Sequence, residues 1–324
     1  MTSAGLAKPY SLRGDRGPLL VSLLVSLSLH GLFLGGLMAL AMASLLFTPM
    51  RRQVKAPQVS RELAPGQSTA LLKELHLLTR EGDLNADSLR KLKQVNHLVR
   101  LLAPAVEDVL SRFGDPVLVD CGAGKGYLGF ILHELFVGPA GKGTIVSVES
   151  RAELVEAAEA RARRLGYGRM RFVHAELERA EIPGRVHLVT ALHACDTASD
   201  DALALAIRHN ADHVAVVPCC QAEVADQLAR APEPRPELAA LYAHPWHRRE
   251  FASHLTNVVR ALALEAHGYK VTVTELAGWE HSLKNELLLG KKVRARGEEA
   301  QARIDSLVAA LGVRPKLVRA LARG

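Results

Sequence analysis

The stretch "VDCGAGKGYLGF", from Val119 to Phe130, decides the fold. Three glycines, Gly122, Gly124 and Gly126, follow an apolar run that ends in an acid and a cysteine. Glycines let the backbone turn sharply and approach a ligand closely, because no Cβ stands in the way. In an open α/β sheet, ligands bind where the parallel strands end. The stretch therefore predicts a strand, a ligand-binding turn and a helix.

Short apolar runs recur along the chain and alternate with helical stretches. Five of them predict parallel strands joined by crossover helices: 116–121, 143–150, 169–176, 185–195 and 212–220. Two further runs, 270–277 and 284–293, have only a short link between them, so we expect antiparallel neighbours. The predicted fold class is α/β, with a Rossmann-like sheet that ends in an antiparallel hairpin.

The rest of the chain divides by composition and periodicity. Apolar positions at helical spacing predict two lead-in helices in 69–112, and another long helix is expected around 249–267. A helical tail should be broken at Pro315. The predicted segments are a basic N-terminus (1–16), an apolar helix (17–49), a linker (50–68), the main domain (69–293) and a basic tail (294–324).

The net charge of +7 is concentrated at the two ends of the chain. Residues 1–61 hold seven Lys and Arg against one acid, and residues 291–324 hold nine against three. The stretch 62–290 is mildly acidic, with 25 bases and 30 acids. This distribution argues against a broad nucleic-acid-binding face on the main domain.

No charged residue lies between Gly17 and Met50, and arginines flank this segment on both sides. A helix that crosses a bilayer needs about 20 apolar residues, so we predict a transmembrane helix over 17–49 that binds the lipid bilayer. A cleaved secretory signal and a true start at Met50 are the alternatives. With the anchor, the following domain is expected to face the cytoplasm; with a start at Met50, the protein would be cytoplasmic.

The spacing of the glycines excludes two common nucleotide loops. Gly122, Gly124 and Gly126 form Gly-x-Gly-x-Gly, whereas dinucleotide sites have G-x-G-x-x-G and phosphate loops have G-x-x-x-x-G-K-[ST]. Lys125 stands between two glycines, and no Ser or Thr follows it. An NAD-dependent oxidoreductase is therefore a weaker hypothesis.

Acids end three successive predicted strands: Asp120, Glu149 and Glu176. A carboxylate at this edge would repel a pyrophosphate, but it suits a ligand with a positive charge. S-adenosylmethionine carries an ammonium and a sulfonium and has no phosphate. Glu149 could accept hydrogen bonds from the ribose hydroxyls, as acids do in other α/β nucleotide sites, and Glu176 could meet the adenine. The sequence thus favours S-adenosylmethionine as cofactor.

With these residues in place, "DCGAGKGYLGF", "LHACD", "VPCCQ" and "SLKNELLLGKK" resemble the class I S-adenosylmethionine-dependent methyltransferases. More narrowly, 85–293 is similar to a methyltransferase-domain family that includes methyltransferase-like proteins, and more distantly to tRNA 2′-O-ribose methyltransferases. The resemblance implies seven strands with the last inserted antiparallel, and a methyltransferase activity. The residues then expected to bind cofactor are Asp120, Gly122, Ala123, Gly124, Gly126, Tyr127, Glu149, Glu176 and Leu192.

The ends of the fourth and fifth predicted strands should face the methyl acceptor. His193 could act as general base, because its pKa lies near the working pH, and Asp196 could orient the acceptor. Similar proteins often read His-Ala-Cys-Gly-Asp here, but this chain has no glycine after Cys195. The predicted acceptor pocket contains Cys195, Pro218, Cys219, Cys220, Trp246, Arg248, Lys284 and Asn285.

The cysteines in this pocket allow a second interpretation. His193 and three cysteines could form a thiolate-rich metal site, but methyl transfer needs no metal and we expect none. No cysteine pair has zinc-ribbon spacing, and a reduced setting is the simpler interpretation for all four thiols. The cysteines are therefore interpreted as walls of the pocket.

The Pro-rich segment 230–249 has two interpretations. It could be a substrate loop in which Tyr242, Trp246 and the arginines stack on a base or neutralise a polyanion. It could equally be the edge of a helix cap.

The leading hypothesis is a methyltransferase, with RNA favoured as acceptor over protein or a small molecule. The basic tail suits RNA and an anionic membrane surface equally. A non-catalytic, membrane-tethered module that keeps the cofactor fold is the remaining alternative.

Overall fold

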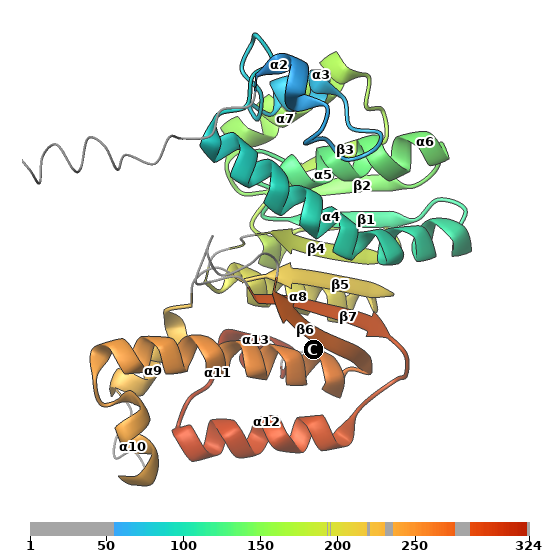
Figure 1. The fold of residues 1–324 in the computed structure, drawn as a ribbon. Coiled ribbons are helices and arrows are strands. Elements are labelled where there is room, and N and C mark those ends of the chain that lie inside the picture. Colours follow the sequence, from blue (N-terminus) through green and yellow to red (C-terminus); the bar gives the residue numbers. More distant parts are fainter. Residues whose placement is uncertain are drawn as a thin grey trace, which may run out of the picture. The chain divides into compact units, whose positions relative to one another are not determined.

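Seven strands form a single sheet in the order β3-β2-β1-β4-β5-β7-β6 (Figure 1). β1 to β5 are parallel, whereas β7 is antiparallel to both β5 and β6. The seven-stranded α/β sheet and its final antiparallel hairpin are therefore confirmed. The strands are β1 (Val117–Cys121), β2 (Thr144–Glu149), β3 (Met170–His174), β4 (Leu188–Leu192), β5 (His213–Val217), β6 (Tyr269–Glu275) and β7 (Glu286–Lys292).

The computed structural model describes residues 55–192, 194, 196–218, 221–230, 236–275 and 286–322. The helices before β4 are α2 (Ala56–Val59), α3 (Thr69–Glu74), α4 (Ala86–Arg112), α5 (Tyr127–Leu132), the π-helix η1 (His133–Val137), α6 (Gly138–Ala140), α7 (Ala152–Leu165) and the 3₁₀ turn η2 (Leu177–Arg179). The later ones are α8 (Ala198–Arg208), α9 (Glu223–Arg230), α10 (Pro236–Tyr242), α11 (Pro245–Ala266), α12 (Glu298–Leu311) and α13 (Lys316–Leu321).

Helices cover both faces of the sheet, and the strands are apolar for that reason. Neighbouring residues of a strand point to opposite faces. In β5, Val214 and Val216 belong to the core cluster that includes α8 and α11, while Ala215 and Val217 belong to the cluster that includes α4 and α5. A strand buried on both faces shows a continuous apolar run rather than alternation. This is why the sequence marks the strands so clearly.

The final hairpin depends on two glycines at which a side chain would collide. A Cβ on Gly290 of β7 would lie 2.7 Å from Val214 Cγ1 of the neighbouring strand. Gly268 has φ +82° between α11 and β6, and a Cβ there would lie 2.0 Å from the carbonyl oxygen of Arg294. The backbone oxygen of Gly268 in turn accepts from the Val293 N–H at 3.0 Å. The turn into β6 is thus in contact with the chain leaving β7.

Several segments differ from their predicted form. The stretch interpreted as a linker contains α2, and Val59 within it is 1% exposed. Only η2 lies between β3 and β4, where a helix was expected. Much of the Pro-rich segment 230–249 is helical, because Pro245 begins α11 and a proline is well tolerated at the first position of a helix. The two tail helices are as predicted, on either side of Pro315.

The predicted transmembrane helix, 17–49, and the basic N-terminus before it lie outside the described residues. Within the described part of the chain, we find no helix with both the length and the apolar character needed to span a bilayer.

Candidate cofactor and acceptor site

The glycine loop has the conformation that its sequence requires. Gly122, Gly124 and Gly126 have φ values of +62°, +57° and +77°, which only glycine adopts without strain. The Ala123 N–H donates to the carbonyl oxygen of Val148 on β2 at 3.0 Å, and the Gly126 N–H donates to Ala123 O at 2.8 Å. The loop is therefore a tight turn attached to the neighbouring strand, and its three glycines place no side chain over it.

Asp120 lies under this loop and is 3% exposed. Thr190 Oγ1 on β4 donates to Asp120 Oδ1 at 3.2 Å, and the Gly129 N–H of α5 donates to Oδ2 at 3.3 Å. Burial raises the pKa of Asp120 to about 7, although both hydrogen bonds act in the opposite direction. A carboxyl group with this pKa changes charge near neutrality, directly beneath the loop.

Glu149 ends β2 and holds the loop from the side. Its Oε2 accepts from the Gly124 N–H at 2.7 Å, and its Oε1 accepts from Arg151 N at 3.2 Å and Arg151 Nε at 2.8 Å. Burial would raise the pKa of Glu149, but the hydrogen bonds from Arg151 and the Gly124 N–H outweigh burial and lower it. Glu149 is therefore an anion that contacts the glycine loop, and the backbone N–H and exposed side chain of Arg151 both donate to its other oxygen.

The other predicted cofactor residues lie at different distances from the glycine loop. Tyr127 begins α5 directly after the last glycine, and Leu192 ends β4, the strand beside β1. Ala194, two residues beyond Leu192, lies close to the glycine loop. A Cβ added to Gly122 would be 3.6 Å from the Cβ of Ala194. Glu176 is exposed at the start of η2. Of the three acids, Asp120 and Glu149 are thus the two that contact the glycine loop or the helix after it.

On the acceptor side the structure describes only part of the predicted set. His193, Cys195, Cys219, Cys220, Lys284 and Asn285 lie outside the described residues. Pro218 is buried at the end of β5. Asp196 has φ +49°, and its Oδ1 accepts from the Ala222 N–H at 3.0 Å. Its carboxylate therefore joins the segment after β4 to the segment after β5.

Trp246 and Arg248 belong to the first turn of α11. His244 caps this helix, because its Nδ1 accepts from the Trp246 N–H at 3.2 Å. Trp246 is 56% exposed and carries the Arg249 guanidinium 4.3 Å from its ring centroid. Arg248 Nη1 donates to Tyr242 O at 3.5 Å. These contacts support the helix-cap interpretation of the segment.

Sequence reasoning missed the residues that support the site. Thr190 holds Asp120 from the next strand, and Gly129 leaves the space in which Asp120 lies, since a Cβ there would be 3.3 Å from Asp120 Oδ2. Arg151 could have been noticed as a base two residues after the acid. Arg260 is the largest fully buried side chain of the described residues. In the sequence, Arg260 could have been noticed as a single arginine among the apolar positions of α11.

Comparison with known proteins agrees with the fold. Residues 90–227 match the family model described as "Methyltransferase domain". A "Glutathione S-transferase C-terminal domain-containing protein" of Bos taurus is 26% identical over 233 residues, which are 65% of this chain and 35% of that protein. The Homo sapiens protein of the same description is 30% identical over 142 residues, 44% of this chain and 20% of that one. The chain thus spans about a third of the length of the first of these relatives.

Solved structures also resemble this chain. Magnesium protoporphyrin IX methyltransferase from Synechocystis PCC 6803 with bound SAH has a TM-score of 0.40 at 14% identity, covering 72% of this chain and 93% of that one. An rRNA methylase from Streptococcus thermophilus has a TM-score of 0.38 at 10% identity, covering 60% and 96%. The family match covers residues 90–227, a stretch that includes β1 to β5, and the strand order with its inserted antiparallel β7 is the one expected from the sequence.

Proposed function

We propose that this chain binds S-adenosylmethionine at the glycine loop and transfers its methyl group to RNA. The observation that supports the proposal most strongly is the pairing of a tight glycine turn with two carboxyl groups, Asp120 beneath it and Glu149 beside it. The bound cofactor supplies an electrophilic methyl group on a sulfonium. The protein supplies position, and it must also accept a proton when the acceptor carries one.

The residues present fit this cofactor better than a dinucleotide. A pyrophosphate at the loop would meet the anionic Glu149, whose oxygens lie against the Gly124 N–H and Arg151. A nucleoside with a cationic tail would instead be attracted to this site, because nearby negative charge favours a cation. Glu149 would accept from the ribose hydroxyls after its contact with Arg151 opens, and Asp120 would supply negative charge beneath the ammonium end.

Cofactor affinity should depend on pH through Asp120. Its pKa is about 7, and only the ionised form attracts a cation. From about pH 6 to about pH 7.5 the ionised fraction rises about eightfold, and the affinity should rise with it. We expect calorimetric titration to show this rise for the wild-type protein and a weak, flatter affinity for Asp120→Asn. Taking the ratio of the two proteins at each pH removes the titration of the ligand itself.

Asp120 should also make the stability of the protein depend on pH. The folded-state pKa of Asp120 is raised above its usual 3.8, so the folded protein binds more protons than the unfolded chain between these values. The free energy of unfolding contributed by this group therefore falls as the pH rises from about 4 to about 7, and Asp120→Asn should remove that fall. A wild-type to Asp120→Asn affinity ratio that stayed constant with pH would contradict the assignment.

A basic groove supports RNA as the acceptor. The groove has a volume of about 660 Å³ and lies between the segment after α2 and the first half of α4. Its charged lining consists of Arg61, Arg90, Lys93 and Arg100 with one carboxylate, Glu62, which lies 4.0 Å from Lys93 Nζ, and Arg90 pairs with Asp87. Lysine and arginine side chains gathered in this way neutralise the phosphates of a nucleic acid.

The groove lies toward the cofactor edge of the sheet. The last turn of α4 contacts the start of β5, since Arg112 Nη2 lies 3.0 Å from Asp212 Oδ1. The first turns of this long helix therefore extend toward the opposite edge, where β1 ends (Figure 1). Arg161 of α7 joins the lead-in to the glycine loop, because it donates to both Glu74 O and Lys125 O at 3.1 Å.

The basic tail contributes less to the proposal than its charge suggests. Lys316 Nζ lies 2.7 Å from Asp201 Oδ2, and Arg319 Nη2 lies 2.6 Å from Glu223 Oε1. These cations neutralise acids of α8 and α9. The groove on α4 has four cations for the two carboxylates Glu62 and Asp87, so it is the better candidate for the acceptor interface.

Transfer of radiolabelled methyl from S-adenosylmethionine to fractionated cell extract tests the proposal. We expect label that ribonuclease releases and protease does not. In the double variant Arg90→Glu with Lys93→Glu, the KM for the labelled RNA fraction should rise about tenfold at physiological salt, because two phosphate contacts become repulsive. The affinity for S-adenosylmethionine should not change.

The matched control is Arg169→Glu with Arg303→Glu, which reverses two exposed arginines that do not line the groove. This control should behave as the wild type. Label in protein or in a small-molecule fraction would overturn RNA as the acceptor, and an absence of transfer to every fraction would leave the cofactor-binding module as the better description.

A further inference from the structure

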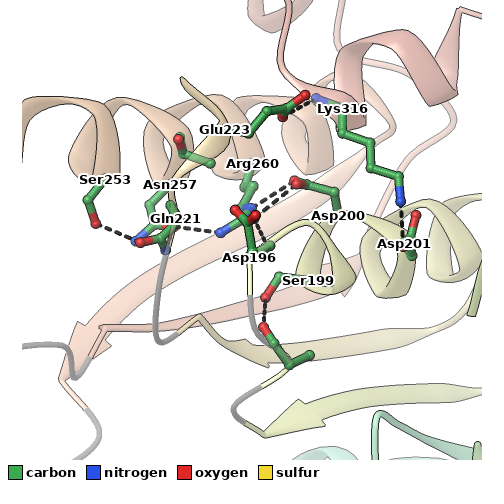
Figure 2. A network of polar contacts seen from close by, with 12 residues as sticks. Asp196, Ser199, Asp200, Asp201, Gln221, Glu223, Ser253, Asn257, Arg260 and Lys316 are labelled. Atoms are coloured by element: carbon green, nitrogen blue, oxygen red, sulfur yellow. Dashed lines mark hydrogen bonds and ion pairs between the residues drawn. The ribbon is translucent and has the colours of Figure 1, made fainter. Parts of the chain in front are cut away.

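A buried polar cluster lies between α11 and the ends of β4 and β5 (Figure 2). At its centre is the guanidinium of Arg260, whose side chain is 1% exposed. Its Nε donates to Asp200 Oδ1 at 2.8 Å and its Nη2 to Asp200 Oδ2 at 3.0 Å, in a bidentate pair with a carboxylate that is 2% exposed. Charges this deeply buried persist only where their partners are well placed. The pair therefore fixes α11 firmly to the start of α8.

The same guanidinium holds the segment that follows β4. Arg260 Nη2 also donates to the backbone oxygen of Asp196 at 2.9 Å. Asp196 has φ +49°, a left-handed conformation that is strained for most residues other than glycine and tolerable for Asp. Its Oδ1 accepts from the Ala222 N–H at 3.0 Å. One residue thus receives a hydrogen bond at its carbonyl oxygen from α11, while its carboxylate holds the segment after β5.

A second branch of the cluster holds Gln221, the neighbour of Ala222. Asn257 Oδ1 accepts from Arg260 Nη1 at 3.1 Å and from Gln221 Nε2 at 3.0 Å. Ser253 Oγ donates to Gln221 Oε1 at 2.6 Å. Asn257 Nδ2 in turn donates to Glu286 Oε2, at the first residue of β7, at 2.8 Å. Three strand ends are therefore attached to one face of α11.

The cluster also connects to the glycine loop. Ser199 Oγ, in the turn before Asp200, donates to the backbone oxygen of Ala194 at 2.6 Å. Ala194 is the residue whose Cβ lies 3.6 Å from the place of a Cβ on Gly122. The hydrogen bonds therefore connect Ala194, which lies beside the cofactor loop, through α8 and Arg260 to Asp196 and Ala222.

We propose that Arg260 is a positioning residue for methyl transfer, and that Asp196 serves it as a tie between the segments after β4 and β5 rather than as a group that contacts the acceptor. The proposal rests on the proposed function, because these segments follow the strands that flank the cofactor edge. Holding them at a fixed distance from the glycine loop sets the alignment of acceptor and methyl group. In a displacement reaction, a misplacement of about 1 Å can cost about 100-fold in rate.

Two substitutions at Asp196 separate a tie from a catalytic carboxylate. Asp196→Asn keeps a side-chain oxygen for the Ala222 N–H and tolerates the left-handed backbone, but it removes the charge. Asp196→Gly keeps the backbone conformation and removes the tie. We expect kcat for the labelled RNA fraction to stay within about twofold of wild type in Asp196→Asn and to fall about 10- to 100-fold in Asp196→Gly. Calorimetric affinity for S-adenosylmethionine should be unchanged in both.

Hydrogen exchange gives a readout that needs no acceptor. Exchange at the Ala222 amide should rise about tenfold in Asp196→Gly, because its hydrogen-bond partner is lost, and should stay unchanged in Asp196→Asn. Asn210→Gly is the matched control, since Asn210 is also left-handed, with φ +50°, but lies before β5 at the opposite edge of the sheet. Arg260→Lys keeps the buried charge, but an ammonium has three N–H groups and cannot make all four hydrogen bonds to Asp200, Asn257 and Asp196 O. This variant should reproduce the loss of kcat without loss of folding.

Equal losses of kcat in Asp196→Asn and Asp196→Gly would overturn the proposal, because the charge rather than the tie would then matter. Unchanged exchange at Ala222 in Asp196→Gly would overturn it independently of any acceptor. A wild-type protein that binds S-adenosylmethionine but labels no fraction would overturn both this role and the enzymatic function, whereas a failure of the tie alone leaves wild-type transfer intact.

Discussion

Replacing Glu149 by Ala is expected to weaken the binding of S-adenosylmethionine by about 100-fold or more. Hydrogen bonds to a charged group contribute about 1.5–3 kcal/mol each, and a ribose offers two hydroxyls to one carboxylate. The substitution also releases the Gly124 N–H, which Glu149 Oε2 holds at 2.7 Å, so the glycine loop loses its lateral support. Calorimetric titration of the purified variant measures the effect.

Arg151→Ala is the matched control for this experiment. The Arg151 guanidinium donates to Glu149 Oε1 at 2.8 Å and its side chain is 59% exposed, so its removal leaves that oxygen with the Arg151 backbone N–H, at 3.2 Å, while the carboxylate stays in place. We expect cofactor affinity to hold or to increase. If Arg151→Ala weakened binding as much as Glu149→Ala, the arginine itself would be the group that recognises the ligand, and the role given to Glu149 would be wrong.

Of all Gly→Ala substitutions in the described fold, Gly268→Ala is expected to destabilise the protein most. The free energy of unfolding should fall by about 3 kcal/mol or more. Two costs combine. The φ of +82° disfavours any side chain, and the new Cβ would lie 2.0 Å from Arg294 O, a backbone atom that cannot rotate away. Chemical denaturation should show a lower midpoint, or the variant should fail to accumulate as folded protein.

Gly184→Ala isolates the first of these costs. Gly184 has φ +81°, almost the same conformation, but a Cβ there would meet nothing within 4 Å. We expect a loss of about 1 kcal/mol, from backbone conformation alone. Similar denaturation midpoints for the two variants would show that the chain near Arg294 moves aside easily, which would contradict the close contact of the two segments.

The fold was predictable where burial is uniform along an element. All five residues of β5 are buried, so the sequence shows an apolar run whatever the tertiary contacts are. The segment around Pro245 was less predictable, because proline both interrupts helices and begins them. What decides between the two is the His244 cap, a local side-chain contact that composition does not reveal.

The candidate site was predictable to the extent that it is local. The glycine loop and Asp120 lie within one short stretch, and Glu149 ends the next strand. Their supports come from far along the chain: Thr190 is 70 residues from Asp120, and Arg260 is 60 residues from Asp200. A single sequence does not show which distant residues pair in this way. It also does not show whether an arginine on a helix is buried or exposed, because that depends on how the helix packs.

The place of β7 between β5 and β6 has a consequence for synthesis on the ribosome. β5 emerges early and β6 follows, yet neither obtains its shared neighbour until residues 286–292 have been translated. A nascent chain therefore presents an unprotected β-edge, which invites pairing with other polypeptides. Chaperones that shield this edge should increase the yield of folded protein, and premature termination before residue 286 should produce an aggregating fragment.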